Sequence, residues 1–256
     1  MQKALITGAS SGIGLALARK LAADGVAVWL AARRSDLLEE AVSSLRAGGH
    51  DAHALTLDVA DHAATERAVA ALDDAIGGID LLVANAGIGS APVPAAKLTF
   101  ERAKHTIDVN LLGALATILP VVPRMVARGR GHVVGVSSLA ADVPLPAAVD
   151  YGVSKAALTF FLESLGADVR SKGVAVTAIH PGFVRTAITD KNTFDMPFLM
   201  SAERAADIIA RGIRRRARVV RFPLPMTIAT LGSRVMPGAL RDALVNANRP
   251  KTSFDD

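Results

Sequence analysis

The sequence predicts an α/β fold built on one doubly wound parallel sheet, and three observations support this prediction. Short apolar runs alternate with longer helix-compatible runs at βαβ spacing between residues 4 and 179. The short runs are apolar at successive positions, which indicates strands buried on both faces. Right-handed crossovers between such strands give a doubly wound sheet. No linker, repeat or low-complexity tract divides residues 1–256, so we expect a single domain.

The expected strands and helices alternate along the chain. The strands occupy residues 4–7, 26–31, 52–57, 81–84, 132–137 and 174–179. The helices occupy residues 13–22, 35–45, 61–76, 100–127 and 150–171. Ser35 is the expected N-cap of the second helix, and Gly77 with Gly78 closes the third. Pro120 and Pro123 are expected to kink the fourth helix or to separate its last turns.

Composition narrows the class of protein. Apolar residues make up 51% of the chain, enough for a sizeable core, and the absence of cysteine excludes disulfides and thiolate metal sites. A strand-like run already begins at Lys3, which leaves no room for a signal peptide. No uninterrupted apolar run reaches the roughly 18 residues of a membrane span. We therefore expect a soluble, cytoplasmic protein, and the spacing of the six histidines predicts no metal site.

Tyr151 and Lys155 form the candidate acid–base pair. Residues four apart on a helix lie on one face, so both side chains can point at one substrate. A nearby ammonium favours the phenolate and lowers the pKa of a tyrosine from its usual value of about 10. A phenol with a lowered pKa can serve as a general acid or base. The same spacing also occurs at solvated helix edges, so the pair needs a cofactor and a pocket beside it.

A glycine-rich turn predicts a dinucleotide site. Gly8, Gly12 and Gly14 follow the first expected strand and open the first helix. Glycine lets the backbone approach a pyrophosphate closely, and a helix N-terminus offers unpaired N–H groups. Asp58 follows the third strand and could accept a hydrogen bond from an adenine amino group, or be a loop carboxylate. The small residues at 85–87 let the sheet edge pass under a flat ligand.

These motifs together resemble the signature of the short-chain dehydrogenase/reductase family. The resemblance rests on residues 7–14, Asn85 with Ala86 and Gly87, Asn110, Ser138, the Tyr151/Lys155 pair, and Pro181-Gly182 with Thr186. It covers about residues 3–190 in the right order. It implies a Rossmann-like fold and an oxidoreductase that interconverts a carbonyl and an alcohol with a nicotinamide dinucleotide.

The resemblance implies a catalytic set of four residues: Asn110, Ser138, Tyr151 and Lys155. Tyr151 would exchange a proton with the substrate oxygen while Lys155 lowers its pKa and holds the nicotinamide ribose. Ser138 would hydrogen-bond the substrate oxygen, with Ser137 as the neighbouring alternative. Asn110 would expose a backbone carbonyl to a water that relays protons to Lys155, or it could be a polar packing residue.

The expected cofactor-binding residues are Gly8, Ser10, Ser11, Gly12, Ile13, Gly14, Arg33, Arg34, Asp58, Val59, Asn85, Ala86, Gly87, Tyr151, Lys155, Pro181, Gly182, Val184 and Thr186. At the end of the second strand, Arg33 and Arg34 stand where an acid would favour NAD(H). Arginine binds a 2′-phosphate through paired N–H donors, so we predict NADP(H), with NAD(H) as the alternative. Ser11 is an argument against NADP(H), because many NADP-binding relatives carry a basic residue there. The two arginines could also be ordinary surface charges.

The chain after residue 186 is expected to cap the site and then to extend beyond it. Residues 187–200 carry Met and Phe side chains that favour an apolar or bulky substrate, unless they only roof the core. Residues 201–256 should form a helical, basic extension with a helix over 201–216, Ser201 as its N-cap, and a short strand at 219–220.

Charge is concentrated in this extension. The net charge is +5, yet residues 201–251 hold 11 Lys and Arg against 3 Asp and Glu. A solvated helix face beside a subunit contact is the favoured interpretation, ahead of an anionic membrane surface and of nucleic acid. The resemblance also implies a homodimer or homotetramer that pairs through residues 100–127 and 150–171. The rival function is a catalytically silent dinucleotide-binding regulator or scaffold, which the intact catalytic set disfavours.

Overall fold

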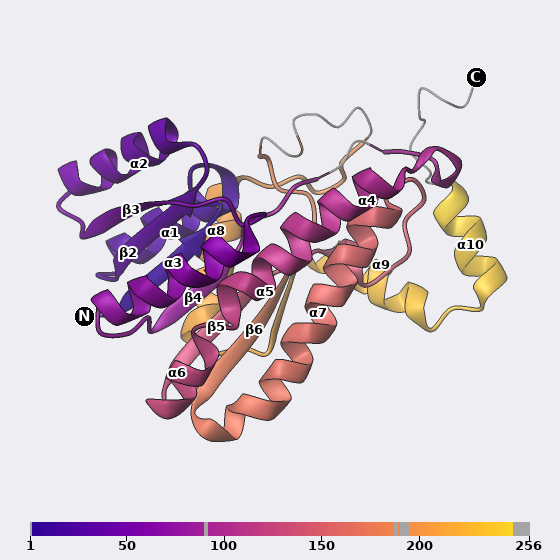
Figure 1. The fold of residues 1–256 in the computed structure, drawn as a ribbon. Helices are drawn as coiled ribbons and strands as arrows, with labels where there is room; N and C mark the ends of the chain where they lie inside the picture. Colours follow the sequence, from indigo (N-terminus) through magenta and orange to yellow (C-terminus); the bar gives the residue numbers. More distant parts are fainter. Residues whose placement is uncertain (1, 90–91, 187–188, 190–194, 248–256) are drawn as a thin grey trace.

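The computed structural model describes residues 2–89, 92–186, 189 and 195–247. Seven parallel strands form one sheet in the order β3-β2-β1-β4-β5-β6-β7, which confirms the predicted doubly wound sheet (Figure 1). The strand bounds are β1 Lys3–Thr7, β2 Ala27–Ala32, β3 Ala52–Thr56, β4 Leu81–Ala84, β5 Gly131–Val136, β6 Val174–Pro181 and β7 Val219–Phe222. The strand order reverses between β1 and β4, and such a reversal opens a crevice at the carboxyl ends of the strands.

Helices cover both faces of the sheet (Figure 1). Their bounds are α1 Gly12–Ala23, α2 Ser35–Ala47, α3 His62–Ala75, α4 Phe100–Ile107, α5 Gly113–Ile118, α6 Val122–Ala127, α7 Val149–Val169, α8 Ala202–Arg214, α9 Leu224–Arg234 and α10 Gly238–Ala247. Short 3₁₀ turns lie at η1 Ala95–Lys97, η3 Leu139–Ala141 and η4 Arg170–Lys172, and a π turn lies at η2 Asp108–Leu112.

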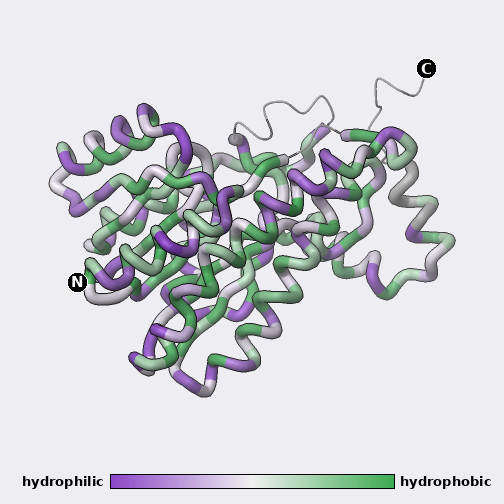
Figure 2. The backbone as a smooth tube through the Cα atoms, viewed as in Figure 1, coloured by the Kyte–Doolittle hydropathy of each residue, from purple (hydrophilic) through white to green (hydrophobic). Residues whose placement is uncertain are grey.

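The core consists of two layers, one on each face of the sheet. Ile6 and Leu30 pack with α1, α2 and α8 in one layer, whereas Leu5 packs with α3, α5 and α7 in the other. Neighbouring strand residues point to opposite faces, and both Leu5 and Ile6 are fully buried. The outer helix α2 alternates between hydrophilic and hydrophobic stretches along its length (Figure 2). A strand buried on both sides therefore reads as a continuous apolar run, and an outer helix as an amphipathic one.

Two predicted helix caps have different outcomes. Ser201 is the N-cap of α8, where its hydroxyl accepts a hydrogen bond from the Arg204 N–H at 3.2 Å. The prediction for Ser35 is wrong, because Ser35 is already the first helical residue and Arg34 occupies the N-cap position. The Arg34 carbonyl accepts the helical hydrogen bond from Leu38, so the helix begins one residue earlier than the serine predicts.

The predicted long helix over residues 100–127 is interrupted twice. One break separates α5 from α6 close to Pro120, as the prolines predict. The other break is the π turn η2, which is centred on Asn110. No residue type in the sequence predicted this turn. In the part of the chain that the structure describes, Phe100–Ala127 alone has the length and mean hydropathy of a membrane span. Over its most apolar window, 56% is buried within the protein, as in the core helix of a globular domain.

The C-terminal extension packs against the sheet and then departs from it. Helix α8 lies on α1, and Arg214 forms an ion pair with Asp24 at 3.1 Å. In the described chain, α9 has no buried residue, and Leu224, Ile228 and Leu231 are exposed along it. Helix α10 stands away from the sheet (Figure 1). Part of the basic charge of this segment is thus paired within the chain, while α9 presents an apolar surface.

Candidate active site

A cavity of about 480 Å³ opens at the carboxyl ends of the strands, where the strand order reverses. It is lined by every predicted cofactor-binding residue except Gly14, and by every predicted catalytic residue except Asn110. The sequence did not single out several residues that also line it: Leu57, Ile88, Gly89, Val109 and Thr189. Leu57, Ile88, Gly89 and Val109 are small or apolar residues near the ends of expected strands or in the π turn, and only that position could have identified them. Thr189 lies in the segment predicted as the lid.

The glycine-rich turn is shaped by close backbone contacts. Gly8 has a φ of +66°, and a Cβ placed on it would lie 2.8 Å from the Ala86 Cα. A Cβ on Gly14 would lie 2.5 Å from the Gly8 carbonyl oxygen. Gly14 therefore faces the turn rather than the cavity, and it lets the first turn of α1 pack against the loop that opens it.

Hydrogen bonds from Thr7 and Asn85 hold this turn beside β4. The Thr7 hydroxyl accepts from the backbone N–H groups of Asn85 and Ala86, both at 3.1 Å. In return, the Asn85 side-chain amide donates to the Thr7 carbonyl at 2.8 Å. These hydrogen bonds fix the loops after β1 and β4 to each other, and no charged group takes part in them.

Two arginines and a carboxylate flank the entrance to this end of the cavity. The Arg34 guanidinium donates to the hydroxyls of Ser10 and Ser11 at 3.3 and 3.2 Å. Arg33 lies 3.8 Å from a carboxylate oxygen of Asp58, and its side chain is 60% exposed. The other Asp58 oxygen accepts from the Ala60 N–H at 3.0 Å. Arg34 thus brings positive charge over Ser11, the position at which the sequence lacks a basic residue.

Tyr151 and Lys155 lie together on α7, with the Lys155 Nζ 5.8 Å from the centre of the Tyr151 ring. The ammonium donates to the Val136 carbonyl at 2.9 Å, and burial lowers the pKa of Lys155 to about 8. Burial raises the pKa of Tyr151, and a hydrogen bond with Ser138 opposes that rise. The sequence predicted a lowered pKa for Tyr151. This prediction is wrong for the protein without a bound cofactor, because the pKa is raised. Desolvation outweighs a cation that lies over the ring face.

The two candidate serines have different surroundings. The Ser137 hydroxyl donates to the Lys155 carbonyl at 2.9 Å and contacts the Thr159 hydroxyl at 2.7 Å, so it ties β5 to α7. Ser138 lies at the cavity that Tyr151 also lines; its oxygen accepts from the Ala140 N–H at 3.1 Å, and its side chain lowers the pKa of Tyr151. Ser138 is therefore the serine placed to touch a substrate.

Asn110 is fully buried behind the cavity wall. Its side-chain oxygen accepts from the Ile88 N–H at 2.7 Å, and its amide donates to the Ile88 carbonyl and the Ser154 hydroxyl at 3.0 and 3.1 Å. A Cβ on Gly87 would lie 3.1 Å from this side chain and 3.3 Å from the Lys155 Nζ. The side chain thus has the packing role that was the alternative interpretation. Its backbone lies in the π turn, where regular helical hydrogen bonding is interrupted.

The wall opposite α7 begins at Pro181 and continues through Thr186. The Thr189 hydroxyl accepts from the Thr186 N–H at 2.9 Å and donates to the Val184 carbonyl at 2.8 Å. A Cβ on Gly182 would lie 2.9 Å from the Met226 sulfur, so α9 backs this wall. The predicted lid over 187–200 falls partly outside the described residues, at 187–188 and 190–194.

Comparison with known proteins places this geometry in context. Residues 2–196 match the family described as short chain dehydrogenase. The chain is 45% identical over 240 residues to a protein of Myxococcus xanthus named uncharacterized oxidoreductase, covering 94% of each. It is 35% identical over 190 residues to the 2-dehydro-3-deoxy-L-rhamnonate dehydrogenase (NAD(+)) of a Sphingomonas species, covering 73% of this chain and 74% of the relative. A solved short-chain dehydrogenase from Sphingobium yanoikuyae in complex with NADPH superimposes with a TM-score of 0.82 at 28% identity, covering 100% of this chain and 99% of that one.

Proposed function

The chain belongs to the short-chain dehydrogenase family of NAD(P)-dependent oxidoreductases, and from this membership we propose that it interconverts a carbonyl and an alcohol with NADP(H). The observation that carries the proposal is the meeting of Ser138, Tyr151 and Lys155 at one cavity with the glycine-rich turn. A phenol, a hydroxyl and a buried cation beside a dinucleotide site are the groups that carbonyl reduction requires. A catalytically silent scaffold would have no need of this set.

The chemistry divides between the cofactor and the protein. When bound, NADP(H) supplies or accepts the hydride at the carbonyl carbon. In reduction, Tyr151 donates its phenolic proton to the carbonyl oxygen, so that the alcohol leaves neutral; in oxidation, the phenolate takes the proton back. The Ser138 hydroxyl donates a hydrogen bond to the same oxygen as negative charge develops there. The protonated Lys155 would stabilise the phenolate, and a backbone carbonyl of the Asn110 turn would hold a water that returns a proton.

The preference for NADP(H) is supported by charge at the cofactor end. Arg34 and Arg33 surround the position after β2 where a 2′-phosphate would lie, and paired N–H donors suit a phosphate. The relatives include both NAD and NADPH in their names, so kinetics must decide. We expect kcat/KM to be higher with NADP(H) than with NAD(H). Comparable values for the two cofactors would contradict the preference.

The substrate proposal is an apolar or bulky carbonyl or alcohol. Met200 pairs with Val184 of the cavity wall, Met226 lies behind Gly182 of the same wall, and thioether side chains adapt to apolar groups. A panel of aliphatic, aromatic and sugar carbonyls, with the matching alcohols, followed by nicotinamide absorbance with both cofactors, tests activity and class together. Turnover confined to sugars would refute the apolar class, and no turnover of any compound would refute the activity.

We further propose a homo-oligomer that pairs through residues 100–127, which form α4 to α6, and through α7. Phe100 and Phe160 are 76% and 74% exposed on these helices, and the pairing would cover this apolar surface. Light scattering after size exclusion would return the monomer mass if the pairing were absent. The lack of cysteine suits a cytoplasmic location, which cell fractionation can test.

A further inference from the structure

A buried carboxylate lies just beyond the serine that faces the substrate. Asp142 is 3% exposed and follows the 3₁₀ turn η3, which Ser138 opens. It lines a second cavity of about 730 Å³ between α7 and the C-terminal segment. The sequence did not mark Asp142 for any role.

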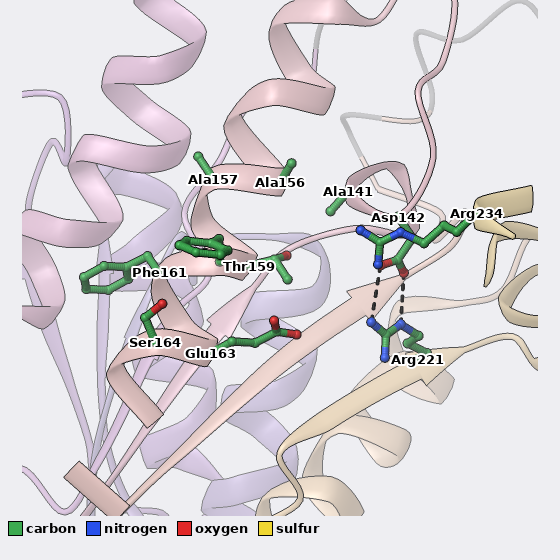
Figure 3. A pocket seen from close by; sticks show the side chains of 11 residues that line it. Ala141, Asp142, Ala156, Ala157, Thr159, Phe161, Glu163, Ser164, Arg221 and Arg234 are labelled. Carbon is green, nitrogen blue, oxygen red and sulfur yellow. Dashed lines mark hydrogen bonds and ion pairs between the residues drawn. The ribbon is translucent and has the colours of Figure 1, made fainter. Parts of the chain in front are cut away.

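Asp142 is paired with arginine from the C-terminal extension. Arg221 on β7 donates to both carboxylate oxygens, from Nε at 2.9 Å and from Nη2 at 3.2 Å, as the paired dashed lines of Figure 3 show. Arg234 on α9 lies 3.9 Å from the same carboxylate. A bidentate pair fixes direction as well as distance, so Arg221 holds Asp142 in one orientation.

The same carboxylate faces the opposite wall of the active site. It lies 3.2 Å from the Nδ1 of His180, the residue before Pro181, and His180 is Arg221's partner in the β6–β7 register. Burial lowers the pKa of His180 to about 4, so the ring is neutral at pH 7. Among the described residues, neither ring nitrogen has a hydrogen bond of good geometry. The carboxylate therefore contacts the strands that carry the Pro181 wall.

Asp142 is also connected to Ser138 through a short turn. The Asp142 N–H donates to the Leu139 carbonyl at 3.0 Å, and the Ala141 N–H donates to the Ser138 carbonyl at 3.0 Å. A 3₁₀ turn of three residues has poor hydrogen-bond geometry and little stability of its own. The position of the turn therefore depends on the contacts that hold its two ends. Its C-terminal end is held by the ion pair between Asp142 and Arg221.

We propose that Asp142 and Arg221 form a positioning pair that holds Ser138 against Tyr151. The pair touches neither substrate nor cofactor; it acts through the η3 turn, and it makes the C-terminal extension part of the active site. The proposal rests on the proposed function for its effect on turnover. Its effect on the Ser138–Tyr151 contact does not depend on any substrate.

Tyr151 is the only tyrosine of the chain, so its ionisation can be followed by ultraviolet absorbance in the intact protein. Ser138 lowers the pKa of Tyr151, so loss of the contact must raise it. We expect Asp142→Asn and Arg221→Lys each to raise the Tyr151 pKa by about one unit, the size of one charge-assisted hydrogen bond. With a substrate from the panel, kcat should fall about tenfold while the KM for NADP(H) stays unchanged. The double variant should show no larger fall in kcat, and no larger rise in the Tyr151 pKa, than either single variant.

Arg214→Gln is the matched control, because Arg214 comes from the same arginine-rich segment and pairs with Asp24 away from the site. It should leave both the Tyr151 titration and kcat as in the wild type. Asp142→Asn leaves a partly buried guanidinium without its carboxylate and could unfold the chain; Arg221→Lys keeps the charge and loses only the paired geometry. A lower Tm with unchanged tyrosine titration in Arg221→Lys would mean a purely structural ion pair and would overturn the proposal. A wild-type protein without turnover would refute the proposed function but would leave the titration test intact.

Discussion

The cofactor end and the catalytic end of the cavity are built from different kinds of contact. At the cofactor end, Gly8, Gly14 and Asn85 bring backbone segments within contact distance, and the arginines lie at the entrance. At the catalytic end, Lys155 is a buried ionisable group, and a second one, Asp142, lies outside the cavity at the end of the turn that Ser138 opens. Backbone contact is insensitive to pH, whereas a buried charge changes both stability and reactivity with pH.

Because of this difference, mutations at the two ends of the cavity should have different effects. A change at the cofactor end should act through sterics or through the arginine charges on cofactor affinity and choice, and leave the chemistry of the bound state intact. A change at the catalytic end should act through protonation and leave cofactor affinity intact. The following predictions test that separation, from the largest expected effect to the smallest.

Replacing Tyr151 with Phe removes the proton donor and changes little else. We expect kcat to fall about 1,000-fold, within the range for loss of a general acid–base group. The Kd for NADPH, measured by its fluorescence, should stay within about twofold of the wild type. Near-normal turnover of the variant would show that another group carries the proton.

Lys155 should give the protein a pH-dependent stability. Its pKa falls from 10.5 to about 8 on folding, so the unfolded chain binds more protons between these values. The free energy of unfolding should therefore rise by on the order of 3 kcal/mol from pH 8 toward pH 10.5. As the pH falls again, this contribution of Lys155 shrinks, and it is absent below pH 8. The raised pKa of Tyr151 opposes this trend above pH 10. Urea unfolding of the wild type and of Lys155→Met from pH 7 to 10 measures this dependence. The free energy of unfolding of the variant should not change with pH over that range.

At the cofactor end, Gly14→Ala should weaken NADPH binding. The new Cβ would lie 2.5 Å from the Gly8 carbonyl, which forces the turn to move. An overpacking strain of about 2 kcal/mol corresponds to a Kd about 30-fold higher. Gly232→Ala in α9 is the matched control, since nothing lies within 4 Å of a Cβ there. Equal affinity in both variants would mean that the turn does not touch the cofactor.

Arg34→Ala should have the smallest effect and should act only on cofactor choice. We expect the ratio of kcat/KM for NADP(H) over NAD(H) to fall about tenfold, through loss of one charged contact near the 2′-phosphate. Activity with NAD(H) should stay unchanged, because the ribose hydroxyls make no use of this charge. Steady-state kinetics with both cofactors measures the ratio, and an unchanged ratio would assign Arg34 to the surface alone.

The two ends also differ in how well the sequence predicted them. The glycine spacing after β1, and the small residues after β4, placed the cofactor end because its contacts are local to strand ends. Ser138, Tyr151 and Lys155 could be named from their motif, and the structure brings them to one cavity. Asp142 could not be found, because its partners Arg221 and His180 lie 79 and 38 residues further along the chain.

By itself, the sequence determined the parallel sheet, the glycine-rich turn and the order of the motifs. These depend on periodicity and residue type over a few positions, which the chain displays directly. Only the tertiary structure decided the π turn at Asn110, the direction of the Tyr151 pKa and the Asp142–Arg221 pair. Each of these depends on how far a group is removed from water and on which distant side chain meets it there. Burial and long-range pairing arise when the layers pack, and no local pattern encodes them.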